Sequence, residues 1–118
     1  MRTPRTFTAA VAFLVLSISA YSDAQTVKCT TWNLESFPNG SAKERPAAQQ
    51  QQRIKEAADV LRPIDPDIIL LQEVKDYDAC ARLGEAIAPG VYHVAICSAF
   101  KEPFQRGFGK QQVAILSK

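Results

Sequence analysis

The feature that most constrains this chain is a short apolar run that follows two prolines. Residues 68–71 are four consecutive large aliphatic side chains, and Pro63 and Pro66 come just before them. Four residues are too few for a helix, but they suit a strand that is buried on both faces. Glu73 follows two residues later. We therefore predict a buried strand over residues 68–72 that ends in a carboxylate at the rim of its sheet, where ligand sites of open α/β sheets gather.

A second β-prone segment, residues 27–35, contains Trp32-Asn33 near its end. If it pairs in parallel with the buried strand, Asn33 and Glu73 reach the same rim, because parallel strands end at one edge of a sheet. A carboxylate at that rim can hold a hard divalent cation. Glu35 also lies close to this rim, and we expect it to be solvated.

Three motifs follow one another along the chain: Trp32-Asn33-Leu34, Leu71-Gln72-Glu73-Val74 and residues 112–117. Together they resemble the start of the endonuclease/exonuclease/phosphatase superfamily, which includes DNase I-like nucleases, abasic-site endonucleases, sphingomyelinases and inositol phosphatases. The resemblance covers about residues 27–118. It implies an α/β fold that is part of a four-layer α/β sandwich of DNase I-like type, incomplete at the C-terminus.

The resemblance also implies a chemistry. Carried over by motif, Glu73 binds the metal and Asn33 helps to position the metal, its water and the phosphate. The implied ion is Mg2+, with Mn2+ or Ca2+ as alternatives, and the implied reaction is phosphodiester hydrolysis. Nucleic acid is the expected substrate, and a phospholipid or an inositol phosphate is the alternative within the family.

Two later motifs of the family, Gly-Asp-x-Asn and a closing Ser-Asp-His, occur nowhere in this sequence. Half of the expected active site is therefore missing. We predict that residues 25–118 are the N-terminal part of such a domain and that this chain by itself does not catalyse hydrolysis. The alternative is a non-catalytic exported α/β module, or a degenerate remnant, whose strands only build a sheet. We also expect the final strand to leave apolar edges unpaired.

The first 24 residues have the pattern of a secretory signal peptide. Arg2 and Arg5 precede an apolar stretch over residues 7–20, and residues 22–24, Ser-Asp-Ala, offer a cleavage site. The apolar stretch is shorter than the roughly 20 residues that span a membrane. We therefore predict a secreted or periplasmic protein with no stable membrane insertion after cleavage.

The charge balance gives little support to nonspecific nucleic-acid binding. The chain has 14 Lys and Arg against 12 Asp and Glu. Lys101, Arg106 and Lys110 form its one dense basic group, which we expect to be a solvated loop. The nucleic-acid partner is therefore an implication of the resemblance alone.

Three cysteines remain after the predicted cleavage: Cys29, Cys80 and Cys97. In an exported protein they permit one disulfide and one spare thiol, in three possible pairings, or a bond to a partner outside this sequence. We favour Cys80 with Cys97, and we expect Cys29 to be buried and unpaired on the first strand. Neither a zinc spacing nor a Cys-x-x-Cys motif is present.

The sequence between the two strands predicts a helix. Ser41-x-x-Glu44 fits a capping box at its start, and Pro63 ends it. Gln50 and Arg53 are expected to face solvent. Its inward residues recur at helical spacing: Ile54, Ala57, Ala58 and Leu61.

The rest of the chain predicts a second helix and two more strands, which gives the order β-α-β-α-β-β. Asp76 caps a helix over about residues 77–88, in which Gly84 is a weak spot. Strands over residues 92–97 and 113–116 follow. His93 is the only histidine, and its mid-strand position indicates a structural rather than a catalytic residue.

Overall fold

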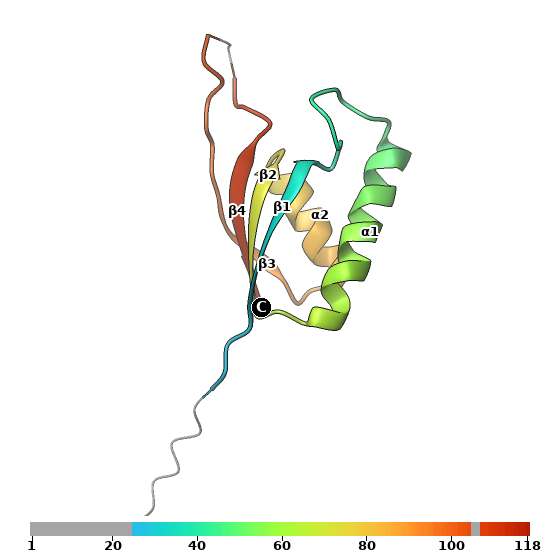
Figure 1. Ribbon diagram of the computed structural model, residues 1–118, viewed down its shortest axis with the longest axis vertical. Coiled ribbons are helices and arrows are strands. Elements are labelled where there is room, and N and C mark those ends of the chain that lie inside the picture. The colour runs from blue at the N-terminus through green and yellow to red at the C-terminus, as the bar shows by residue number, and fades with distance from the viewer. Residues whose placement is uncertain (1–24, 105–106) are drawn as a thin grey trace, which may run out of the picture.

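The computed structural model describes residues 25–104 and 107–118. The predicted signal peptide, residues 1–24, and Arg106 lie outside the described residues. The elements follow the predicted order: β1 (Cys29–Phe37), α1 (Ala47–Ile64), β2 (Ile68–Val74), α2 (Tyr77–Ile87), β3 (His93–Cys97) and β4 (Gln112–Ser117). Both helices lie on the same face of a single sheet (Figure 1).

The sheet has the strand order β1-β2-β4-β3. β1 pairs with β2 in parallel, as predicted, and the other two pairs are antiparallel. The described residues therefore form an α/β fold with one sheet and one helical layer. β4 lies inside the sheet between β2 and β3, so the expectation that the final strand leaves unpaired edges is wrong. The edge strands are β1 and β3.

The apolar run on β2 is buried on one face rather than on both. Ile69 and Leu71 are fully buried beneath the helices, whereas Ile68 and Leu70 are half-buried on the opposite face. No described element covers that opposite face, on which Ile96 and Val113 are exposed. The strand therefore alternates despite its uniform composition, because only one side has a helical layer.

The first helix begins later than its sequence predicts. Pro46 occupies the N-cap position without a side-chain cap, so the predicted capping box is wrong. Ser41 instead donates to the carbonyl of Lys43. Glu44 turns toward Lys75, with 2.6 Å between its Oε1 and the lysine Nζ. The four predicted inward residues are all buried, and the helix ends at Ile64, just past Pro63.

The second helix begins as predicted, because the Asp76 carboxylate accepts the backbone N–H of Ala79 at 2.8 Å. Gly84 is a point of close packing rather than a weak spot. A Cβ at this position would lie 3.2 Å from the Cβ of Tyr92. Tyr92 itself is buried and donates its hydroxyl to the carbonyl of Pro66 at 2.6 Å.

The three cysteines do not form a disulfide in the structure. Cys29, Cys80 and Cys97 are all free thiols, so the favoured bond is absent. Cys29 is exposed on the edge strand β1, which corrects the expectation that it is buried. Cys80 is buried and Cys97 is half-buried.

Gln112 closes the base of the loop between β3 and β4. Its side chain is buried and makes four hydrogen bonds. The Oε1 atom accepts from the Ser98 hydroxyl and the Phe100 N–H, both at 2.7 Å. The Nε2 atom donates to the carbonyls of Phe100 and Gly109. Both ends of the loop are therefore held by one amide.

We expect Gln112→Ala to lower the free energy of unfolding by about 1–3 kcal/mol, because it leaves buried partners without a hydrogen bond. Hydrogen exchange at the Phe100 amide should become faster. Urea unfolding and amide exchange measure the two effects, with the exposed neighbour Gln111→Ala as the control. Equal stability of the two variants would contradict this role for Gln112.

Candidate active site

Asn33 and Glu73 meet at the rim of the sheet, as the parallel pairing predicts. The Asn33 Nδ2 donates to the Glu73 Oε1 at 2.9 Å. Asn33 is exposed and Glu73 is half-buried, so the pair is open to solvent. The structure thus brings both predicted site residues together, near the carboxyl end of β2 and at the last regular pair of β1 before Phe37.

An irregularity in the ladder makes this contact possible. Asn33 pairs with Gln72, and the next pair is Phe37 with Val74. Glu73 alone therefore lies opposite three residues of β1. On the other side of β2, Gln72 and Val74 pair with adjacent residues of β4, so Glu73 is the extra residue of a bulge against that strand. Leu71 and Val74 both face the core, and the bulge turns the Glu73 side chain to the rim.

The backbone at this bulge adopts a left-handed conformation. Glu73 has φ 56°, and Glu35 and Ser36 opposite it have φ 50° and 55°. This region is unfavourable for residues with a Cβ, and such strain is found at functional sites more often than elsewhere.

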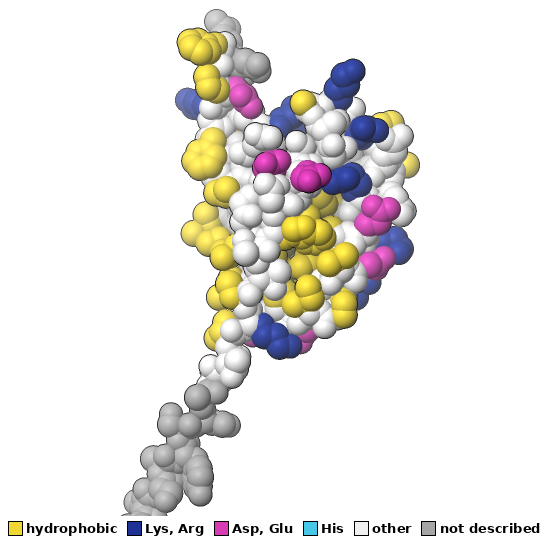
Figure 2. Space-filling model, viewed as in Figure 1, with side chains coloured by type: hydrophobic (Ala, Val, Ile, Leu, Met, Phe, Trp, Pro, Cys, Tyr) yellow, Lys and Arg dark blue, Asp and Glu magenta, His cyan; other side chains and the backbone are white. Residues whose placement is uncertain are grey.

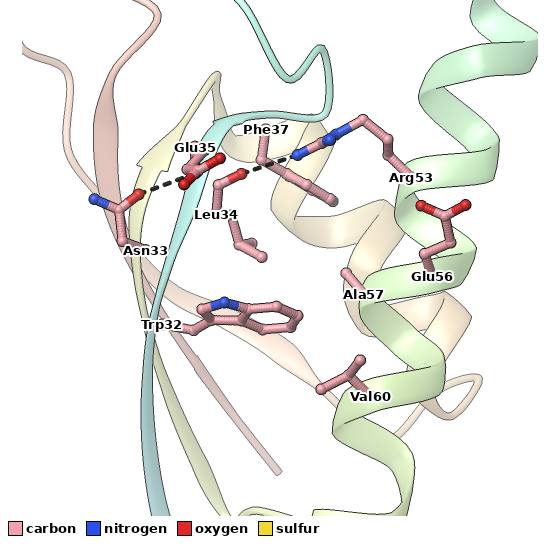
Figure 3. Close-up of a pocket in the computed structure, with 9 residues that line it drawn as sticks. All are labelled: Trp32, Asn33, Leu34, Glu35, Phe37, Arg53, Glu56, Ala57 and Val60. Carbon is pink, nitrogen blue, oxygen red and sulfur yellow. Dashed lines mark hydrogen bonds between the residues drawn. The ribbon is translucent and has the colours of Figure 1, made fainter.

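The side chain of Asn33 has a fixed orientation. Its Oδ1 accepts the backbone N–H of Glu35 at 2.9 Å (Figure 3). The amide nitrogen must therefore face Glu73, and the oxygen is already engaged. Glu35 is exposed, as expected, and its backbone rather than its carboxylate orients Asn33. Sequence patterns gave no sign of this backbone contact.

Arg53 holds the turn that follows Asn33. Its Nη2 donates to the Leu34 carbonyl at 3.2 Å (Figure 3). A Cβ at Gly40 would lie 2.8 Å from the guanidinium carbon, so the turn packs directly on this group. The prediction that Arg53 faces solvent is therefore wrong, and so is that for Gln50, which is buried.

A groove opens between β1 and α1 beside this turn, with a volume of about 370 Å³. Trp32, Ala57 and Val60 contribute apolar walls, and Glu35 and Glu56 lie at its border. Figure 2 shows hydrophobic side chains gathered between the sheet and the first helix, with acidic side chains above them.

Glu44 connects three loops at the same rim. Its carboxylate binds Lys75 after β2 at 2.6 Å and Lys110 before β4 at 3.5 Å. Gln50 of α1 also donates to it. The hydrogen bond from Lys75 is the largest cause that lowers the pKa of Glu44 from 4.5 to about 2.

The donor set at the rim suits a hard cation but is small. Among residues 25–104 and 107–118, no three His, Cys, Asp or Glu side chains form a metal-binding group. Glu73 offers its Oε2, and one carboxylate with water and phosphate oxygens is a common arrangement for Mg2+. His93 is exposed on β3, which agrees with its predicted placement on the strand surface.

Comparison with known proteins gives the family. The model of the endonuclease/exonuclease/phosphatase family matches residues 30–118. The chain belongs to this family. No curated protein and no solved structure matches the chain. Members of this family generally depend on metal and act on phosphodiester substrates. None of the described helices is long and apolar enough to cross a membrane.

The left-handed backbone at Glu73 gives a testable difference between two variants. Glu73→Gly and Glu73→Ala both remove the carboxylate and its bond to Asn33. Only glycine adopts φ 56° without a steric cost. We expect Glu73→Gly to be more stable than Glu73→Ala by about 1 kcal/mol, measured by urea unfolding. The reverse order would show that this residue is not held in the left-handed region.

Proposed function

We propose that this chain supplies one half of the active site of a Mg2+-dependent phosphodiester hydrolase that acts on nucleic acid. The observation that carries the proposal is the Asn33–Glu73 hydrogen bond at the shared end of two parallel strands. Export to the cell exterior or the periplasm, with residues 1–24 removed as a signal peptide, is part of the same proposal. So is a four-layer sandwich for the complete domain.

Charge singles out Glu73 as the carboxylate that would hold the ion. In the described part of the chain Glu73 makes no ion pair, and its one partner is the neutral amide of Asn33. Glu44 lies near the same rim but is already paired with Lys75 and Lys110. Glu73 therefore keeps its negative charge available for a cation at this position, directly beside the Asn33 amide.

The chemistry that follows divides between the two residues. A bound magnesium ion would neutralise the phosphate and polarise its oxygen. Glu73 would hold the ion through Oε2 while Oε1 stays on Asn33. Asn33 would keep the carboxylate in place and present its second N–H to a phosphate oxygen. The backbone N–H of Glu35 fixes the amide for both tasks.

Metal binding at Glu73 can be tested without activity. Mn2+ is a paramagnetic substitute for Mg2+, and we expect it to broaden the backbone amide signals around Glu73 and Asn33 in NMR spectra. Glu73→Gln should abolish this broadening because it removes the charge that attracts the ion. Glu85→Gln, an exposed carboxylate on α2, should leave it unchanged. Broadening that survives Glu73→Gln would contradict the site.

Hydrolysis is a separate question, because the two later motifs of the family do not occur in this sequence. We expect purified chain with Mg2+ to cleave plasmid DNA no faster than its Glu73→Ala variant. Gel electrophoresis of the plasmid measures this. Mg2+-dependent cleavage that Glu73→Ala abolishes would show that the chain assembles a complete site. Absence of both cleavage and Mn2+ binding would favour the non-catalytic module.

A further inference from the structure

We propose that Cys80 and Cys97 are a redox-active thiol pair that closes to a disulfide between α2 and β3 when the chain meets a disulfide oxidant such as glutathione disulfide. This inference does not depend on the proposed hydrolase function. It concerns the described fold alone, in which both cysteines are thiols.

The register of the sheet points Cys97 toward the helices. Cys97 pairs with Ala114, and residues directly opposite on antiparallel strands share a face. Ala114 is buried on the helix-covered face, so Cys97 lies on that face too. A register shift between Val94 and Ile96 places both Val94 and Cys97 there. Strict alternation would have turned one of them to the opposite face.

Cys80 faces the same space from α2. It is fully buried in the core, and Cys97 packs against that core. Cys97 lines a cavity with Asp76 and Tyr77 at the start of α2. Cys80 lies one turn further along this helix, and its backbone N–H donates to the Asp76 carbonyl at 3.3 Å. Burial, the largest cause, raises the pKa of the Cys80 thiol to about 12, and Cys97 also contributes to this increase. The two thiols are therefore neighbours.

Cys29 is too distant to compete within one molecule. It lies on β1, and the order β1-β2-β4-β3 puts two strands between it and β3. Adjacent strands are about 4.8 Å apart, so Cys29 is roughly 14 Å from β3. A disulfide needs Cα atoms within about 7 Å. Exposed Cys29 therefore cannot bond to Cys97 within the same molecule.

The reaction balances with a disulfide oxidant. The Cys97 thiolate attacks glutathione disulfide, a mixed disulfide forms and one glutathione thiolate leaves. The Cys80 thiolate then attacks the Cys97 sulfur, the protein disulfide forms and a second glutathione thiolate leaves. The protein loses two protons and two electrons, and two molecules of glutathione are produced. Burial raises the pKa of the Cys97 thiol as well, so the exchange should be slow.

The test uses Cys29→Ser in the full chain, so that only the proposed pair remains. After incubation with glutathione disulfide, non-reducing peptide mapping should find Cys80 joined to Cys97, with the loss of two hydrogen atoms in the intact mass. The cross-link closes the chain over residues 80–97, which should raise the melting temperature by about 10 °C. Dithiothreitol should reverse both changes.

The matched control is Cys29→Ser with Cys97→Ser, whose melting temperature should not respond to the oxidant. Cys97 is half-buried, so this variant should keep its fold, which circular dichroism checks. The proposal is overturned if both thiols remain free after oxidation of the folded chain. It is also overturned if they bond only to glutathione or to other molecules.

Discussion

The parallel pairing of β1 with β2 is the contact on which the rest of this structure depends. Parallel neighbours need a crossover connection, and α1 provides it by packing across one face of the sheet. Once the crossover is made, both strands run in the same direction and end at the same edge. Asn33 and Glu73 are separated by 40 residues in sequence, yet they meet because Asn33 is the last residue of β1 before the irregularity and Glu73 lies within it on β2.

β1 and β2 have different numbers of residues between their last two paired positions, and this mismatch shapes the site. Between two paired positions β1 contains Leu34, Glu35 and Ser36, whereas β2 contains only Glu73. Glu35 and Ser36 of this surplus, and Glu73 itself, have positive φ, which costs free energy that the surroundings must offset. Leu34 is buried below the turn, and Arg53 holds its carbonyl from α1. α1, the helix that makes the parallel pairing possible, thus also holds the strained backbone of the rim in place.

Sequence patterns predicted what depends on near neighbours and failed where distant partners decide. The order of elements, the Asp76 cap and the inward face of α1 follow from local spacing, and all were confirmed. The capping box failed because Glu44 binds Lys75, 31 residues away, in preference to the start of the helix. The sequence also did not reveal that one face of the sheet is uncovered. A run of four aliphatic residues is expected whether helices cover one face of a strand or both.

Glu44 shows how the rim is assembled from loops that share no sequence pattern. Its own loop follows β1, Lys75 follows β2 and Lys110 precedes β4, so one carboxylate ties three strand ends together. Its pKa is lowered from 4.5 to about 2, so these contacts contribute stability above pH 4.5 that is lost as the pH falls toward 2. Because Lys75 is occupied by Glu44, it does not neutralise Glu73 two residues earlier. The same ion pair that fastens the loops therefore leaves Glu73, among the described residues, with the neutral Asn33 amide as its partner.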